Sequence, residues 1–253
     1  MRIFDLSGRI ALVTGASRGI GLALAGALAD AGATVVINGR DKDRLQQAQS
    51  LIARNGAHVR IAEFDVTDAT TVAAAIASIE HDVGPIDILV NNAGMQFRTP
   101  LQDYPLDKWR ELFRLNTEGP FIVSQAVAQG MIARGSGKII NICSVQSELG
   151  RPGIAPYAAT KGALKMLTKG MCADWAKYGI QVNGIGPGYF KTELNAALVN
   201  DPEFSAWLEK RTPAGRWGEI HELGGAVVFL ASDASSFVNG HILYVDGGIT
   251  STL

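Results

Sequence analysis

Short apolar runs alternate along the chain with longer segments in which apolar positions recur every three or four residues. The short runs, several of them rich in β-branched side chains, predict strands, and the longer periodic segments predict helices. The predicted strands cover residues 10–13, 34–37, 58–63, 86–90, 138–142, 180–183 and 241–245. The predicted helices cover residues 19–31, 41–55, 70–82, 109–134 and 157–178, and Gly119 with Pro120 predicts a kink in the fourth.

Strands that alternate with helices predict an α/β fold with a doubly wound, Rossmann-type sheet. We expect seven parallel strands with helices on both faces, because crossover connections are right-handed and cover both sides. No linker or repeat interrupts the pattern, so residues 1–253 are predicted to form a single domain. Residues 192–216 are predicted to form a small helical lid. Ligands of such sheets bind where the strands end, which directs attention to the loops that follow each strand.

Composition narrows the class of protein. The 253 residues are 47% hydrophobic and 19% charged, which supplies a core and excludes a disordered chain. A net charge of −1 without any basic run argues against nucleic acid as a partner, and no apolar run predicts a membrane span. Two cysteines, Cys143 and Cys172, show neither metal-ligand spacing nor a disulfide framework, which favours a cytoplasmic protein without a metal site.

A glycine-rich loop joins the first predicted strand to the first helix. The glycines Gly15, Gly19 and Gly21 have the spacing Gly-x3-Gly-x-Gly. Glycine lets the backbone approach a phosphate, and the helix N-terminus offers unpaired N–H groups to an anion. The same glycines could instead serve tight packing of the helix on the sheet. Their place between a strand and a helix favours phosphate binding.

The end of the second strand predicts which dinucleotide is bound. An acidic residue there would hold a ribose diol and indicate NAD, but this chain has Gly39 and Arg40. Arg40 and Arg18 could together face a ribose 2′-phosphate, whereas Asp41 is placed to cap the next helix. The pair of arginines therefore favours NADP, although either alone could be an ordinary surface residue.

Tyr157 and Lys161 lie one turn apart at the start of the fifth predicted helix. A nearby ammonium, together with a positively charged nicotinamide ring, would lower the pKa of the phenol toward the value a general acid–base needs. Ser144 follows the fifth strand and could polarise a substrate oxygen. Asn116 is an amide among apolar neighbours, which fits either a functional role or a hydrogen-bonded core residue.

With these residues in place, the whole chain resembles the short-chain dehydrogenase/reductase family. Asn116, Ser144, Tyr157 and Lys161 match the family's catalytic tetrad, with Cys143 standing where many members have a second serine. The resemblance implies that NADP is bound by the glycine loop and by three further segments that match family motifs. The cofactor-binding residues it implies are Gly15, Ser17, Arg18, Gly19, Ile20, Gly21, Arg40, Asp65, Val66, Asn92, Ala93, Gly94, Tyr157, Lys161, Pro187, Gly188, Phe190 and Thr192.

The segments at residues 141–151, 187–190, 210–218 and 237–241 are similar to members of the family that act on sugar acids. That similarity implies reversible oxidation of D-gluconate at C5 to 5-keto-D-gluconate, in a cytoplasmic homotetramer assembled through the late helices and the last strand. The substrate-binding residues expected are Arg98, Ser144, Gln146, Tyr157 and Tyr189. The substrate carboxylate is assigned to Arg98, with Arg151 and Lys191 as alternatives.

The sequence leaves two alternative hypotheses for the function open. The first is a reductase of the same fold that acts on a 3-oxoacyl thioester or on another sugar or keto acid. The polar loops after the strands argue against a fatty substrate, which would need apolar walls. The second is a dinucleotide-binding regulator without chemistry, for which an intact Ser144, Tyr157 and Lys161 would be unnecessary.

Overall fold

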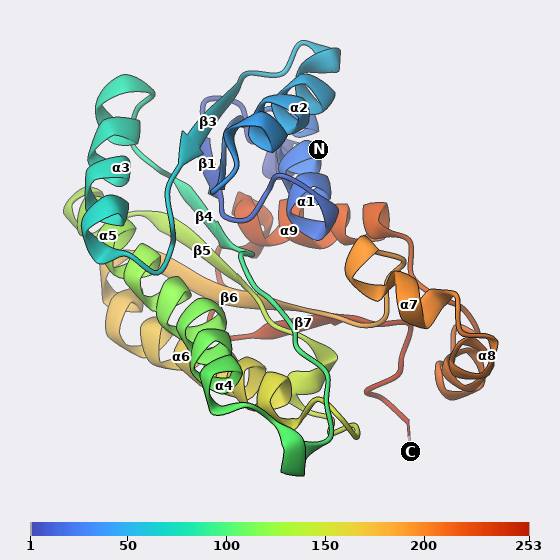
Figure 1. The fold of residues 1–253 in the computed structure, drawn as a ribbon. Helices are drawn as coiled ribbons and strands as arrows, with labels where there is room; N and C mark the ends of the chain where they lie inside the picture. The colour runs from blue at the N-terminus through green and yellow to red at the C-terminus, as the bar shows by residue number, and fades with distance from the viewer. Residues whose placement is uncertain (1, 253) are drawn as a thin grey trace.

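A computed structural model describes residues 2–252 and shows one parallel sheet between two layers of helices (Figure 1). The seven strands lie in the order β3-β2-β1-β4-β5-β6-β7, and every neighbouring pair is parallel. The strands are β1 (Ile10–Val13), β2 (Thr34–Gly39), β3 (Val59–Glu63), β4 (Ile88–Asn91), β5 (Gly137–Ile142), β6 (Ile180–Pro187) and β7 (Ile242–Val245). The predicted doubly wound, seven-stranded sheet is confirmed.

Helices cover both faces of this sheet. On one face lie α1 (Gly19–Asp30), α2 (Lys42–Ile52) and α9 (Gly224–Ala231), and on the other lie α3 (Ala69–Asp82), α4 (Leu106–Phe113), α5 (Gly119–Arg134) and α6 (Ala155–Trp175) (Figure 1). Two short helices, α7 (Ala196–Val199) and α8 (Pro202–Arg211), project beyond β6 at one end of the sheet (Figure 1).

The core is divided by the sheet into two apolar layers. Successive side chains of a strand point to opposite faces, so Ala11 and Val13 join the layer under α1 and α9, whereas Leu12 joins the layer under α3 and α5. All four residues of β1 are buried because helices cover both sides of it. This explains why the strands appear in the sequence as uninterrupted apolar runs.

The fourth predicted helix, residues 109–134, differs from the structure in where it begins and in its continuity. It begins earlier, at Leu106, and is divided by a π-helical segment, Arg114–Glu118, before it continues as α5. The irregularity predicted at Gly119 and Pro120 therefore lies just ahead of them, where Pro120 is tolerated in the first turn of α5. A π-helical turn re-aims the side chains within it, and Asn116 is one of them.

The chain reverses its winding direction between β1 and β4. Strands β2 and β3 lie on one side of β1, and β4 to β7 extend on the other. The loops that leave neighbouring strands at such a point diverge to opposite faces and open a crevice at the carboxyl ends of the strands. The glycine loop after β1 and Asn92 after β4 border this crevice.

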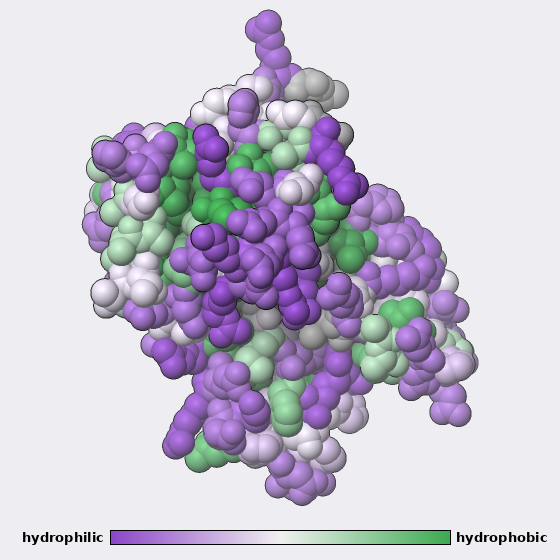
Figure 2. All heavy atoms as spheres, turned by 45° about the horizontal axis from the view of Figure 1, so that its top comes forward, coloured by the Kyte–Doolittle hydropathy of each residue, from purple (hydrophilic) through white to green (hydrophobic). Residues whose placement is uncertain are grey.

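The segment between β6 and α9 builds a third, smaller apolar cluster. Tyr189, Phe204 and Trp217 pack with ring centroids 5.8 to 6.1 Å apart, and Leu208 of α8 is buried beside them. This cluster attaches α7 and α8 to the end of the sheet. The face shown in Figure 2 is largely hydrophilic, with apolar residues in separate groups.

Within residues 2–252, no helix is long and apolar enough to cross a membrane. The same residues contain no group of three or more His, Cys, Asp or Glu side chains placed to hold a metal ion.

Candidate active site

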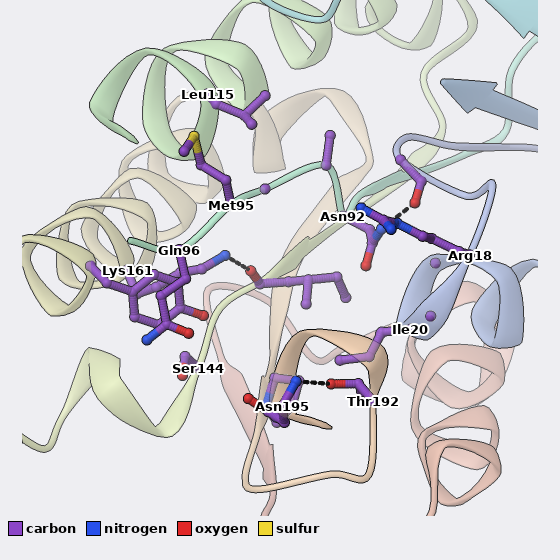
Figure 3. Close-up of a pocket in the computed structure, with 18 of the residues that line it drawn as sticks. Arg18, Ile20, Asn92, Met95, Gln96, Leu115, Ser144, Lys161, Thr192 and Asn195 are labelled. Atoms are coloured by element: carbon purple, nitrogen blue, oxygen red, sulfur yellow. Dashed lines mark hydrogen bonds between the residues drawn. The ribbon is translucent and has the colours of Figure 1, made fainter. Parts of the chain in front are cut away.

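A cavity of about 630 Å³ lies at the carboxyl ends of the strands. Its walls come from the glycine loop, the loops after β2, β3, β4, β5 and β6, the start of α6 and the segment around α7. Figure 3 shows Arg18 and Ile20 at one side of this cavity, Lys161, Gln96 and Ser144 at the other, and Thr192 with Asn195 along one edge. The cavity is therefore long enough to bring the glycine loop and the polar loops into one site.

Three glycines shape the first wall of the cavity for two different reasons. Gly15 has a φ of +61°, and a Cβ there would lie 2.7 Å from the Cα of Ala93, so side chains are excluded by sterics. A Cβ on Gly21 would lie 2.4 Å from Nδ2 of Asn92. Gly19 has a φ of +58° with open space around it. The first two glycines serve packing, and Gly19 leaves a cradle at the start of α1.

The loop after β4 locks this wall in place. Nδ2 of Asn92 donates to the carbonyl oxygens of Thr14 and Gly15, at 3.0 Å each. The hydroxyl of Thr14 accepts from the backbone N–H groups of Asn92 and Ala93. These reciprocal bonds fix the distance between the ends of β1 and β4, where the winding direction changes.

Four charged side chains surround the outer end of the cavity. Arg40 lies 3.7 Å from Asp65, and Arg18 lies 3.3 Å from Glu193. Burial raises the pKa of Asp65, but the hydrogen bonds from Thr67 and the charge of Arg40 outweigh it and leave that pKa below its usual value. Both arginine side chains are largely exposed, so they are free to turn toward an anionic ligand in the cavity.

Ser144 and Tyr157 face each other across the inner end of the cavity. Ser144 ends the loop after β5, and its hydroxyl accepts from the backbone N–H of Gln146 at 3.1 Å. Burial raises the pKa of the Tyr157 phenol to about 12, while a hydrogen bond with Ser144 and the charge of Arg98 act in the opposite direction. In the protein alone, the phenol is therefore a proton donor.

Lys161 lies on the same face of α6 as Tyr157, as its position one turn later requires. Its ammonium donates to the carbonyl oxygen of Ile142 at 2.7 Å and lies 5.8 Å from the centre of the Tyr157 ring. Burial lowers the pKa of Lys161 to about 8. Desolvation is the largest effect on the pKa of the phenol. The predicted lowering depends on a bound nicotinamide ring as well as on Lys161, and it stays a prediction.

Asn116 does not line the cavity; it is buried one layer behind it. Its Oδ1 accepts from the N–H of Met95 at 2.8 Å, and its Nδ2 donates to the carbonyl of Met95 at 2.9 Å and to Thr160 at 3.2 Å. The amide thus ties the π-helical segment both to the loop after β4 and to α6. Met95 itself lines the cavity, so Asn116 positions part of its wall.

Polar side chains dominate the inner end beyond Ser144 and Tyr157. Arg98 donates to Oε1 of Gln96 at 3.0 Å and to Oδ1 of Asn195 at 3.2 Å. Nε2 of Gln146 donates to the hydroxyl of Tyr189 at 3.3 Å. Arg151 completes the polar wall there. This end can make many hydrogen bonds to a polyhydroxylated ligand.

The structure brings nearly all of the predicted site residues to this one cavity. The two that do not line it are Asn116 and Phe190, and Phe190 is buried in the core against Gly218. Lys191, an alternative for binding a carboxylate, also lies outside and pairs with Glu219 at 2.6 Å. Arg151, the other alternative for binding the carboxylate, does line the cavity. Cavity residues absent from the predicted set are Asn38, Gly39, Phe64, Met95, Gln96, Leu115, Ile142, Cys143, Val145, Ile154, Glu193, Asn195 and Leu198.

One signal in the sequence points to some of these residues. A polar residue in a loop that follows a strand, such as Gln96, lies where ligands of parallel sheets bind. Glu193 and Asn195 come from a segment whose approach depends on how the chain folds back after β6. No spacing along the sequence encodes that approach.

The parallel sheet carries a glycine loop after β1, Ser144 after β5, and Tyr157 with Lys161 in the first two turns of α6. Together these features define a class of dinucleotide-binding proteins. The chain belongs to the short-chain dehydrogenase/reductase family. Residues 15–250 match the family model described as enoyl-(acyl carrier protein) reductase.

Individual relatives are similar to the chain over nearly its whole length. It is 60% identical over 251 residues to the gluconate 5-dehydrogenase of Gluconobacter oxydans (strain 621H), with 99% of this chain and 98% of the relative covered. It is 53% identical to the 5-keto-D-gluconate 5-reductase of Escherichia coli (strain K12), covering 98% and 97%. A crystal structure of a gluconate 5-dehydrogenase from Burkholderia cenocepacia J2315 in complex with NADP and tartrate matches with a TM-score of 0.97 at 61% identity, covering 99% and 98%.

Proposed function

We propose that the chain catalyses the reversible, NADP-dependent oxidation of D-gluconate at C5 to 5-keto-D-gluconate. The observation that carries the proposal is the meeting of Ser144, Tyr157 and Lys161 with the glycine loop in one cavity whose inner end is polar. The activity named for two relatives at 60% and 53% identity supports the choice of substrate.

The residues at the outer end fit NADP. A dinucleotide phosphate needs a backbone that leaves room at a helix N-terminus, and the open space around Gly19 at the start of α1 supplies it. A ribose 2′-phosphate needs cations, and Arg18 and Arg40 border the same end of the cavity. The relative from Burkholderia cenocepacia was crystallised with NADP, which supports the same assignment.

The chemistry divides between the dinucleotide and the protein. Held by Gly19, Arg18 and Arg40, the dinucleotide would supply the hydride acceptor for oxidation and, in its reduced form, the hydride donor for the reverse direction. In the reductive direction the Tyr157 phenol gives its proton to the carbonyl oxygen and becomes a phenolate. In the oxidative direction that phenolate takes the proton of the substrate hydroxyl. Ser144 donates a hydrogen bond to that oxygen, and Lys161 holds a positive charge beside the phenol. Asn116 keeps the wall around Met95 in register with α6.

A second candidate is a reductase of acyl thioesters, since the matching family model is described as an enoyl-(acyl carrier protein) reductase. An acyl chain requires apolar walls. The inner end of this cavity instead presents Arg98, Gln146 and Arg151, so this candidate is the weaker one. A regulator that only binds a dinucleotide is weaker still, because it has no use for the Ser–Tyr–Lys group.

We also propose how the chain operates as a whole. Residues 1–253 act as one domain, in which residues 192–216 form a lid over the substrate; the contacts of Glu193 and Asn195 with Arg18 and Arg98 support this. The protein acts as a cytoplasmic homotetramer. The unpaired Cys143 and Cys172 support the compartment, and the fully exposed ring of Phe237, five residues before β7 in the chain, supports the assembly.

The test is a panel of carbonyl substrates. NADPH oxidation is followed with 5-keto-D-gluconate, 2-keto-D-gluconate, fructose and an acetoacetyl thioester, each over a range of concentrations. We expect kcat/KM for 5-keto-D-gluconate to exceed that for each of the others by at least about tenfold, since polar discrimination of this kind contributes a few kcal/mol. A higher kcat/KM for the thioester would favour the acyl-thioester reductase. If none of the four compounds is reduced, the proposal that the chain is such an enzyme is rejected.

A further inference from the structure

The inner end of the cavity carries an excess of positive charge. Arg98, Arg151 and Lys161 line it. The acids that line the described cavity, Asp65 and Glu193, lie against Arg40 and Arg18 at the outer end. Lys161 is buried, Arg151 is partly buried and Arg98 is exposed, and like charges that share a cavity repel one another unless an anion joins them. This end is therefore built to receive a negatively charged group.

The two arginines are not equivalent with respect to the reacting centre. Arg98 and Tyr157 line the same cavity, and the charge of Arg98 acts to lower the pKa of Tyr157. Arg151 acts on Arg98 and on Tyr189 instead: burial first, and then the charge of Arg151, hold the pKa of Arg98 below its usual value. Arg151 lies against Phe204, whereas Arg98 bonds Gln96 and Asn195. We call the side of the cavity that Arg151 and Tyr189 line its far end.

Two buried polar atoms at this far end make no hydrogen bond within the described chain. They are Nε of Arg151, a donor, and Oε1 of Gln146, an acceptor. Gln146 is only 7% exposed, and its Nε2 already donates to Tyr189. Buried polar atoms without partners are rare in proteins and costly. Both side chains bond Tyr189, so this donor and this acceptor belong to one polar group and match a ligand that carries both a carboxylate and a hydroxyl.

Aromatic residues hold Arg151 in place for this task. Its guanidinium lies 5.3 Å from the centre of the Phe204 ring in α8, and a hydrogen bond joins it to Tyr189. The Tyr189 and Phe204 rings are themselves 5.8 Å apart. A guanidinium supported on one face by a ring keeps its donor edge directed into the cavity.

We propose that Arg151 is the specificity-determining residue that binds the carboxylate of the substrate, with Oε1 of Gln146 accepting from the neighbouring hydroxyl. The inference rests on the proposed function, because in gluconate the carboxylate lies at the opposite end of the carbon chain from C5. Arg98 then binds hydroxyl groups nearer the reacting carbon. Phe204 is a positioning residue that acts through Arg151.

The test compares an acid with its neutral amide. D-Gluconate and D-gluconamide are oxidised by the wild type and by Arg151→Gln, and the ratio of the two kcat/KM values is measured. We expect Arg151→Gln to lower the value for gluconate by about 10- to 100-fold, the effect of losing a hydrogen bond to a charged group, and to leave gluconamide within about threefold. Arg151→Lys should restore part of the ratio, and Phe204→Leu should raise the KM for gluconate alone.

The matched control is Arg211→Gln. Arg211 is the last residue of α8, the helix that carries Phe204, but it bonds Thr252 outside the cavity. The ratio of kcat/KM for gluconate to that for gluconamide should therefore be the same in Arg211→Gln as in the wild type. An unchanged ratio in both Arg151→Gln and Arg151→Lys overturns the inference, as does a collapse of the ratio in Arg98→Gln only. If the wild type oxidises neither compound, the proposed function fails instead, which keeps the two failures distinct.

Discussion

At the scale of single residues, the site depends on how burial acts on a phenol and an amine. Tyr157 and Lys161 have pKa values of about 12 and about 8, each shifted by burial toward its neutral form. Ser144 and Arg98 oppose the shift of the phenol. The sequence predicted the pair from its spacing, but the extent of desolvation depends on which loops cover α6. That extent could not be obtained from the chain alone.

Tyr157→Phe removes the proton that the proposed reaction transfers. We expect kcat to fall by about 10³-fold, within the range measured for general acid–base groups, while the dissociation constant for NADPH stays within about twofold. Steady-state kinetics and fluorescence titration with NADPH give the two quantities. The control is Tyr178→Phe, at a partly exposed tyrosine outside the cavity, which should leave both unchanged. Turnover near the wild-type level would reject Tyr157 as the acid–base group.

Because burial lowers the pKa of Lys161, we expect the free energy of unfolding to depend on pH. Its pKa is about 8 in the folded protein, below the usual 10.5, so between these values the unfolded chain holds a proton that the folded chain has released. The penalty of burying the ammonium is therefore full below about pH 8 and disappears as the pH rises toward 10.5.

Urea unfolding of the wild type and of Lys161→Met from pH 7 to pH 10 measures this penalty. The difference in the free energy of unfolding should shift in favour of the wild type by on the order of 3 kcal/mol across this range. A constant difference would show that Lys161 is not desolvated in the folded protein.

If Arg40 binds the ribose 2′-phosphate, its removal should weaken the binding of NADP but not that of NAD. We expect Arg40→Ala to weaken NADP binding by about 10- to 100-fold, because a hydrogen bond to a charged group is lost, with NAD binding changed by less than about twofold. Isothermal titration with each dinucleotide measures this. Equal losses for the two would remove the argument for 2′-phosphate recognition.

At the scale of elements, the glycine loop and α1 combine two kinds of glycine. A Cβ on Gly21 would meet Asn92 and the carbonyl of Gly15, whereas a Cβ on Gly26, farther along α1, meets nothing within 4 Å. The sequence predicted the loop and its place after β1. It did not distinguish glycines that permit contact with β4 from those exposed on the helix, because the neighbour comes from another part of the chain.

Gly21→Ala and Gly26→Ala test that distinction. Gly21→Ala should destabilise the protein by about 1–3 kcal/mol, the range for overpacking a tight site, and should also weaken NADPH binding. Gly26→Ala should stabilise it by about 0.5–1 kcal/mol, since alanine favours a helix interior. Thermal and urea unfolding measure both. A Gly21→Ala variant as stable as the wild type would mean that the contact with Asn92 can relax.

At the scale of the whole molecule, the ends of strands far apart in sequence meet at one edge of the sheet. The predicted strands and the doubly wound order are confirmed because each element carries its own apolar pattern. The contacts of residues 192–216 with the cavity were not predictable in detail. They depend on packing of Phe204 and Trp217 against Tyr189, which no local pattern reports.

The proposed tetramer predicts where assembly is sensitive. In light scattering after size exclusion, the wild type should have the mass of four chains. Phe237→Asp should lower that mass, because a charge would replace a fully exposed aromatic ring in the segment that leads into β7. Leu51→Asp, at a half-exposed leucine of α2, is the control and should keep the mass. A monomeric wild type would reject the tetramer.

The sequence by itself determined the elements, their alternation and the residue types after each strand, since these follow from local periodicity and from glycine, proline and charge at fixed positions. Only the tertiary structure decided three contacts. Asn116 lies behind the cavity wall and positions Met95, Lys191 pairs with Glu219 outside the cavity, and the guanidinium of Arg151 packs on the Phe204 ring. The reason is that side-chain partners depend on packing between segments far apart along the chain, and on how much water that packing removes.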